Sequence, residues 1–156
     1  VRYCHSRRIC HCNLMLENIL VTKDDQLKLI DFGLSKMLQG EKFETLCGSS
    51  SYVSPEMLLG ERYDGEAIDV WALGIILFAM VCGYMPFDDD DTSGLYKQIV
   101  NGQFEIPDHV SAELADLLRK MIEVDPLKRA SMQEICEHEW FLASPEPIPE
   151  FVQTSG

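Results

Sequence analysis

The chain has 156 residues, of which 46% are hydrophobic and 25% are charged, and a formal net charge of −13 at pH 7. This length and composition predict one globular domain with a real core. The negative charge argues against binding to nucleic acid or to an anionic membrane, because both reward clustered Lys and Arg, and basic partners would be attracted instead.

The longest unbroken apolar run, Val70 to Cys82, is too short to span a bilayer and contains Gly74. It predicts a buried core helix rather than a transmembrane segment. No signal peptide is visible, because the first residues are polar and basic with no apolar stretch behind them. Val1 is not a Met, which is consistent with a start farther upstream and with a fragment of a longer chain.

Cysteine usage indicates a reducing compartment. The six cysteines are Cys4, Cys10, Cys12, Cys47, Cys82 and Cys136. Two of them fall in predicted core or helix segments, which favours reduced thiols over a disulfide framework. We therefore expect an intracellular protein, in the cytoplasm or alternatively in the nucleus.

A cluster near the N-terminus raises the question of a zinc site. Soft ligands are available from Cys4, His5, Cys10, His11 and Cys12. Neither a paired CxxC spacing nor a second half-site follows, so the structural interpretation is favoured. In that interpretation Cys4 and His5 end a helix, and residues 10–12 form a short strand that enters a loop.

Short strands are predicted after the end of a helix at residues 1–8. Brief apolar runs with Thr and Val favour strands at residues 9–11, 19–21 and 27–30. Asp24 and Asp25 support a reversing turn between the last two strands. This is a small hairpin that frames a loop.

A long loop and then helices follow the hairpin. Residues 33–55 show no sustained period and contain Gly40, Gly48 and a Ser triplet, which predicts a long functional loop. The predicted helices that follow cover residues 67–82, 93–101, 111–123 and 131–138. The second half of the chain is therefore predicted to be an α-helical bundle.

Three features of the second half have structural interpretations. One face of a predicted helix is an apolar stripe of core residues: Leu114, Leu117, Leu118, Met121 and Ile122. The acidic run at residues 88–91 lacks the alternating oxygen ligands and the Gly of a calcium loop, so we favour a solvated loop. Residues 144–149 contain three Pro and are predicted to be extended.

Five sequence blocks occur in a fixed order. They are His11-Cys12-Asn13-Leu14-Met15-Leu16-Glu17-Asn18, Asp31-Phe32-Gly33, Ser54-Pro55-Glu56, Asp69-Val70-Trp71-Ala72-Leu73-Gly74 and Asp125-Pro126-Leu127-Lys128-Arg129. In this order and spacing, residues 1–141 resemble the C-terminal lobe of a Ser/Thr protein kinase. Resemblance to the AMP-activated and calmodulin-dependent kinase group is carried by Thr45-Leu46-Cys47-Gly48-Ser49, Tyr63-Asp64-Gly65 and His138-Glu139-Trp140-Phe141.

The resemblance implies an α+β fold, mainly α, with a short β-hairpin, a helical bundle and no N-terminal lobe. The kinase-like C-lobe would cover residues 1–142, and a Pro-rich tail would follow at 143–156. Within the lobe we expect a catalytic loop at 11–18, a metal loop at 31–33, an activation segment at 31–56 and a helical subdomain at 67–142.

The resemblance also implies that half of an ATP site is present. Asp31 and Asn18 would hold magnesium ions at the ATP phosphates, because both offer hard oxygen ligands. Leu20 would form the floor beneath the adenine, and Thr45 would be the phosphorylated residue of the activation loop. Structural roles would fall to His11, Phe32, Ser49, Glu56, Asp69 and Arg129.

Specific contacts are expected among these structural residues. Glu56 should pair with Arg129 and brace the segment that follows the activation loop. Asp69 should accept hydrogen bonds from the backbone of the catalytic loop.

The departures from the kinase pattern are concentrated where phosphate is moved. Asn13 stands where the resemblance calls for an Asp that accepts the substrate hydroxyl proton, and an amide has no useful basicity. Met15 replaces a Lys that would steady the transferring phosphate. Cys12 replaces an Arg that would read a phosphate on Thr45. These changes predict a catalytically impaired protein.

A second deficit is the lack of a glycine-rich phosphate loop, of a strand Lys and of its helix Glu in these residues. ATP binding by this chain alone is therefore expected to be weak, and phosphotransfer negligible. The favoured function is a pseudokinase that docks other proteins, such as a kinase, a substrate or a regulatory subunit. Two alternatives stay open: an ATP-dependent Ser/Thr kinase whose N-terminal lobe lies outside these residues, and a nonfunctional relic.

Overall fold

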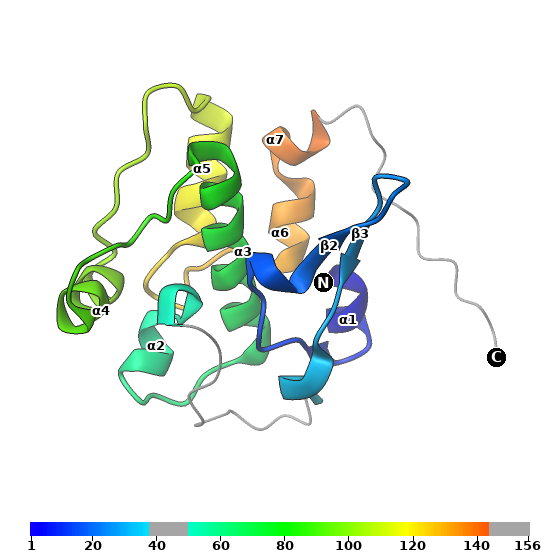
Figure 1. Ribbon diagram of the computed structural model, residues 1–156, viewed down its shortest axis with the longest axis horizontal. Helices are drawn as coiled ribbons and strands as arrows, with labels where there is room; N and C mark the ends of the chain where they lie inside the picture. The colour runs from blue at the N-terminus through cyan, green and yellow to red at the C-terminus, as the bar shows by residue number, and fades with distance from the viewer. Residues whose placement is uncertain (38–49, 144–156) are drawn as a thin grey trace.

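The computed structural model describes residues 1–37 and 50–143. Within them, α-helices dominate and the strands form two separate two-stranded antiparallel ladders (Figure 1). The expected α+β, mainly α, fold is therefore confirmed. Thr45, Ser49 and the Pro-rich stretch at 144–149 lie outside the described residues.

The first third of the chain is a helix followed by short strands and single 3₁₀ turns. In chain order these are α1 (Arg2–Ser6), β1 (Ile9–Cys10), η1 (Leu16–Asn18), β2 (Ile19–Val21), β3 (Leu27–Leu29), η2 (Phe32–Leu34) and β4 (Lys36–Met37). The three predicted strands are present, and two of them end one residue early. The sequence did not predict β4, which pairs with β1 through Cys10 and Lys36.

The predicted hairpin is formed by β2 and β3, with Leu20 opposite Lys28. Its turn is closed by a hydrogen bond from the Thr22 N–H to the Gln26 carbonyl at 2.8 Å. Asp25 has φ +57°, a left-handed conformation that Asp tolerates better than most residues. The Asp pair therefore makes the reversal, as predicted.

The helical half is built around α3 (Gly65–Cys82), which lies near the centre of the molecule in Figure 1. The predicted start at residue 67 was two residues late, because the Asp64 carboxylate accepts the Glu66 N–H and caps the helix earlier. A Cβ on Gly74 would lie 2.8 Å from Ile122 Cγ1, so this glycine allows close packing of the chain after α5.

By length and composition alone, α3 could cross a membrane. However, 61% of the apolar window is buried inside the fold, including Trp71, Ile75 and Phe78. The helix is therefore the core helix that the apolar run predicted.

The other helices pack around α3. They are η3 (Ser50–Tyr52), α2 (Pro55–Leu58), α4 (Thr92–Asn101), α5 (Ala112–Met121), α6 (Met132–Glu137) and α7 (Glu139–Leu142). Ser111 and Ser131 cap α5 and α6, and Ser131 forms a capping box with Glu134. The predicted apolar stripe of α5 is buried in the core. The acidic run at 88–91 is an exposed loop that ends at Asp91, the residue before α4.

Candidate functional site

Asp69 connects the central helix to the segment that the sequence predicts as a catalytic loop. Its side chain is almost fully buried, and its oxygens accept the backbone N–H groups of His11 at 2.8 Å and Cys12 at 2.9 Å. His5 Nε2 donates to the same carboxylate at 2.8 Å. Three donors satisfy the buried charge and hold residues 11–12 against α3.

The predicted role of Asp69 as an acceptor for this backbone matches these contacts. The contribution of His5 was not predicted, because its sequence context indicated only a helix end or, less favoured, a zinc ligand. No local pattern points to the pair, since the two residues are 64 positions apart.

Asn13 and Asp31 lie side by side. The Asn13 amide Nδ2 donates to Asp31 Oδ2 at 3.1 Å, and Asn18 Nδ2 donates to the Asn13 backbone carbonyl at 2.8 Å. The structure thus brings together three of the predicted site residues from segments 11–18 and 31–33. The contact needs a donor at position 13, which an amide supplies and an ionised carboxylate does not.

The conformation of Asp31 is set locally. It has φ +61°, and its Oδ1 accepts the Gly33 N–H at 3.3 Å. A Cβ on Gly33 would lie only 3.1 Å from Asp31 Oδ1, so the glycine leaves room for this turn. Asp31 therefore has a left-handed backbone conformation that its hydrogen bond from the Gly33 N–H stabilises. Such a conformation indicates a conformationally constrained functional site.

His11 and Phe32 are in ring contact, with centroids 4.6 Å apart and an interplanar angle of 64°. His11 is buried, and its Nε2 donates to the Ile30 carbonyl at 3.0 Å. Phe32 is 42% exposed, and Leu20 on β2 is also exposed. Met15 is partly buried and places no charge beside Asn13 and Asp31.

A buried ion pair lies between α2 and the loop before α6. Arg129 Nη1 and Nη2 donate to the two oxygens of Glu56 at 2.7 and 2.9 Å, and both side chains are almost fully excluded from solvent. The guanidinium also donates to the carbonyls of Glu123 and Ala67 and lies 5.0 Å from the Trp71 ring. This is the pair that the resemblance predicted.

A family model described as the protein kinase domain matches residues 1–141. The chain belongs to the protein kinase family. It is 42% identical over 157 residues to the probable serine/threonine-protein kinase MARK-A of Dictyostelium discoideum, covering 100% of this chain and 15% of that protein. It is 44% identical over 142 residues to serine/threonine protein kinases OSK3 and OSK4 of Oryza sativa subsp. japonica, covering 90% of this chain and 28% of each protein.

These kinases are much longer than the chain, which spans less than a third of each of them. The match nevertheless includes all five sequence blocks. It therefore places segments 11–18 and 31–33 and the Glu56–Arg129 pair inside a kinase domain.

One buried cluster in this kinase fold has the residue types of a metal site. Side-chain ligand atoms of His5, Cys10 and Asp69 lie within 4.8 Å of one another. Burial, and secondarily the charge of Asp69, raise the pKa of the Cys10 thiol well above its usual range. A protonated thiol is a poor metal ligand, and both oxygens of Asp69 already accept hydrogen bonds. Protein donors therefore already satisfy Asp69, and its hydrogen bond with His5 gives these two residues a structural role beside Cys10.

The buried, protonated state of the Cys10 thiol gives a testable prediction. In the native protein at pH 8, iodoacetamide should modify Cys10 at least about a hundredfold more slowly than in the unfolded protein, because the thiolate is the nucleophile and burial suppresses it. Peptide mass spectrometry measures the modification, and Cys4, which is only partly buried, is the internal reference. Equal rates in the native and unfolded protein would contradict the buried thiol.

Proposed function

We propose that the chain is the C-terminal lobe of a catalytically impaired Ser/Thr kinase domain that acts by docking other proteins. We propose that this domain is related to the AMP-activated and calmodulin-dependent kinase group, which its motifs resemble. The observation that carries the proposal is the hydrogen bond from the Asn13 amide to the Asp31 carboxylate. The Asn13 side chain, at the position of the catalytic base, donates an N–H hydrogen bond to Asp31 and has no basicity to accept a proton from a substrate.

The surroundings of Asn13 support the same proposal. Met15 offers neither a charge nor a donor for a transferring phosphate. The backbone N–H of Cys12 donates to Asp69, and the Cys12 side chain is buried. A cysteine at this position has no guanidinium with which to bind a phosphate on Thr45. Both the transfer step and its phosphate switch are therefore proposed to be impaired.

Magnesium and ATP are expected from the family in general. Asp31 supplies a carboxylate and Asn18 an amide oxygen, and these hard ligands fit magnesium. Bound magnesium would neutralise charge on the ATP phosphates. One oxygen of Asp31 already accepts a hydrogen bond from the Asn13 amide. The exposed Leu20 is the residue proposed to contact the adenine. We propose that this half-site binds ATP weakly by itself.

The second candidate is an active Ser/Thr kinase whose N-terminal lobe lies outside these residues. It is supported by the retained Asp31 and Asn18 and by relatives that are described as serine/threonine kinases. In either case we propose that partners are proteins rather than nucleic acid or membrane, and that the protein acts in the cytoplasm or the nucleus.

The deciding experiment uses the full-length protein and radiolabelled magnesium ATP. We expect phosphate transfer to generic Ser/Thr peptides to stay at background, while proteins still bind to the domain. The result that would overturn the proposal is clear phosphate transfer by the native protein, above background, that the double substitution Asn13→Asp, Met15→Lys does not raise further.

A further inference from the structure

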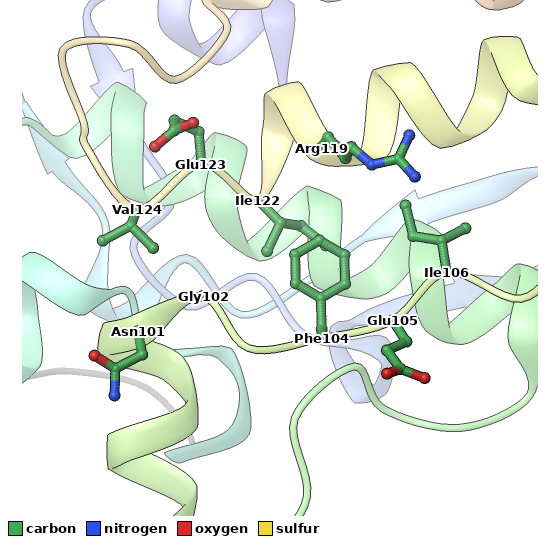
Figure 2. Close-up of a pocket in the computed structure, with 9 residues that line it drawn as sticks. All are labelled: Asn101, Gly102, Phe104, Glu105, Ile106, Arg119, Ile122, Glu123 and Val124. Atoms are coloured by element: carbon green, nitrogen blue, oxygen red, sulfur yellow. The ribbon is translucent and has the colours of Figure 1, made fainter.

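A cavity of about 620 Å³ lies away from the residues of the kinase site. It is formed by the end of α4, the segment after it and the C-terminal end of α5 (Figure 2). This volume falls within the range of about 300–1,000 Å³ that is typical of pockets for small ligands.

The floor of the cavity is apolar and rigid. Phe104 makes edge-to-face contacts with Phe78 and Phe87, at centroid distances of 6.0 and 5.6 Å, so its ring is fixed to the core. Ile122 is only 3% exposed, and in Figure 2 it lies next to Phe104. A pocket with fixed walls loses little conformational entropy when it is filled.

One wall depends on a glycine. Gly102 ends α4 with φ +60°, and a Cβ at this position would lie 2.7 Å from Val124 Cγ2. The end of α4 can therefore approach the segment after α5 closely. Gly102 and Val124 both line the cavity.

The rim carries two carboxylates and one guanidinium. Glu105 and Arg119 are exposed, and neither forms an ion pair within residues 1–37 and 50–143. Glu123 accepts the Asp125 N–H through Oε1 at 3.0 Å, which keeps its carboxylate in place. Figure 2 shows Glu105 and Glu123 on opposite sides of Phe104. The lining is net acidic, and it belongs to a chain of net charge −13.

We propose that this cavity docks a short segment of a partner protein in which one apolar side chain is flanked by Lys or Arg. The apolar side chain would bury against Phe104 and Ile106, which are only partly buried, and the flanking cations would meet Glu105 and Glu123. This deepens the proposed docking function by giving it a surface and a partner chemistry. Binding at the cavity is independent of phosphotransfer.

The test is fluorescence anisotropy with the full-length protein at low salt. The probe is a fluorescein-labelled peptide with one central Phe between two pairs of Arg, in a Gly and Ser background. We expect saturable binding that weakens roughly tenfold when the probe's Phe becomes Ser, because the buried ring area is lost. We also expect Glu105→Lys to weaken binding by roughly tenfold, because it reverses a rim charge.

The matched control is Asp24→Lys, which makes the same charge change in the exposed hairpin turn and should alter binding less than about twofold. A second variant, Arg119→Gln, removes the cation of the rim and should strengthen binding by about threefold. Glu105 and Arg119 are both exposed, so neither change should alter the melting temperature.

Three results would overturn the docking site: no saturable binding, equal weakening by Glu105→Lys and Asp24→Lys, or tighter binding of a probe in which Glu replaces Arg. The last result would assign the cavity to an anion at Arg119. Phosphotransfer measured on the same preparations separates the two proposals, since an active native protein would overturn impaired catalysis and leave the peptide result standing.

Discussion

Arg129→Met is expected to destabilise the domain by about 3–5 kcal/mol, because it leaves the Glu56 carboxylate buried without a partner. The change also removes hydrogen bonds to three backbone carbonyls, those of Ala67, Glu123 and Val124, which join α3 to the segment before α6. The free energy of unfolding of a typical domain is only about 5–15 kcal/mol, so this substitution would remove a large share of it. Urea denaturation of the full-length protein, followed by circular dichroism, measures the loss.

Two controls separate a broken buried pair from a simple loss of charge. Lys120→Met breaks an exposed ion pair, in which the Lys120 side chain is 53% exposed and the Asp116 side chain is 50% exposed. This change should leave the urea midpoint nearly unchanged. Glu56→Gln combined with Arg129→Met removes both buried charges and should be less damaging than Arg129→Met alone. If Lys120→Met and Arg129→Met shift the midpoint equally, the Glu56–Arg129 pair does not brace the fold.

Asn13→Asp combined with Met15→Lys is expected to raise phosphotransfer by the full-length protein roughly a hundredfold to ten-thousandfold, the usual contribution of a general base. The introduced carboxylate would accept the substrate proton, and the introduced ammonium would compensate charge on the transferring phosphate. Initial rates with radiolabelled ATP and a Ser/Thr peptide measure the effect. The gain depends on a complete ATP site elsewhere in the protein.

The hydrogen bond of Asn13 suggests a cost to this restoration. Asn13→Asp replaces the donor to Asp31 by a second carboxylate, and two anions at this distance repel each other. Magnesium should therefore stabilise Asn13→Asp against heat more than it stabilises the native protein. Asn13→Ala is the matched control for the phosphotransfer measurement. It removes the same hydrogen bond to Asp31 without supplying a base, so it should give no gain in the phosphotransfer rate.

Local structure was largely predictable because it depends on neighbours in the sequence. The hairpin turn at Asp24 and Asp25, and the starts of α5 and α6 after Ser111 and Ser131, use side chains that bond backbone groups within a few residues. The one-turn helices α2 and α7 were missed, because four residues are too few to show a helical period. The early start of α3 was missed because Asp64 was not recognised as its cap.

The functional residues also fall into two groups, those that the sequence predicted and those that only the structure revealed. The order of the sequence blocks pointed to the kinase family and to the residues that depart from its pattern, since residue types can be read one by one. No sequence pattern predicted the cavity lined by Phe104, because its walls come from α4, α5 and the segments after each of them. The expected phosphosite Thr45 stays a prediction.

The sequence by itself determined the longer helices, the hairpin, the family and the amide at position 13, because each depends on nearby residues or on a motif. Only the tertiary structure decided that the Asn13 amide donates to Asp31, that β1 pairs with β4, and that His5 is a third donor to Asp69. These contacts join residues from 18 to 64 positions apart. Their geometry depends on how the whole chain packs its core, and no local pattern contains it.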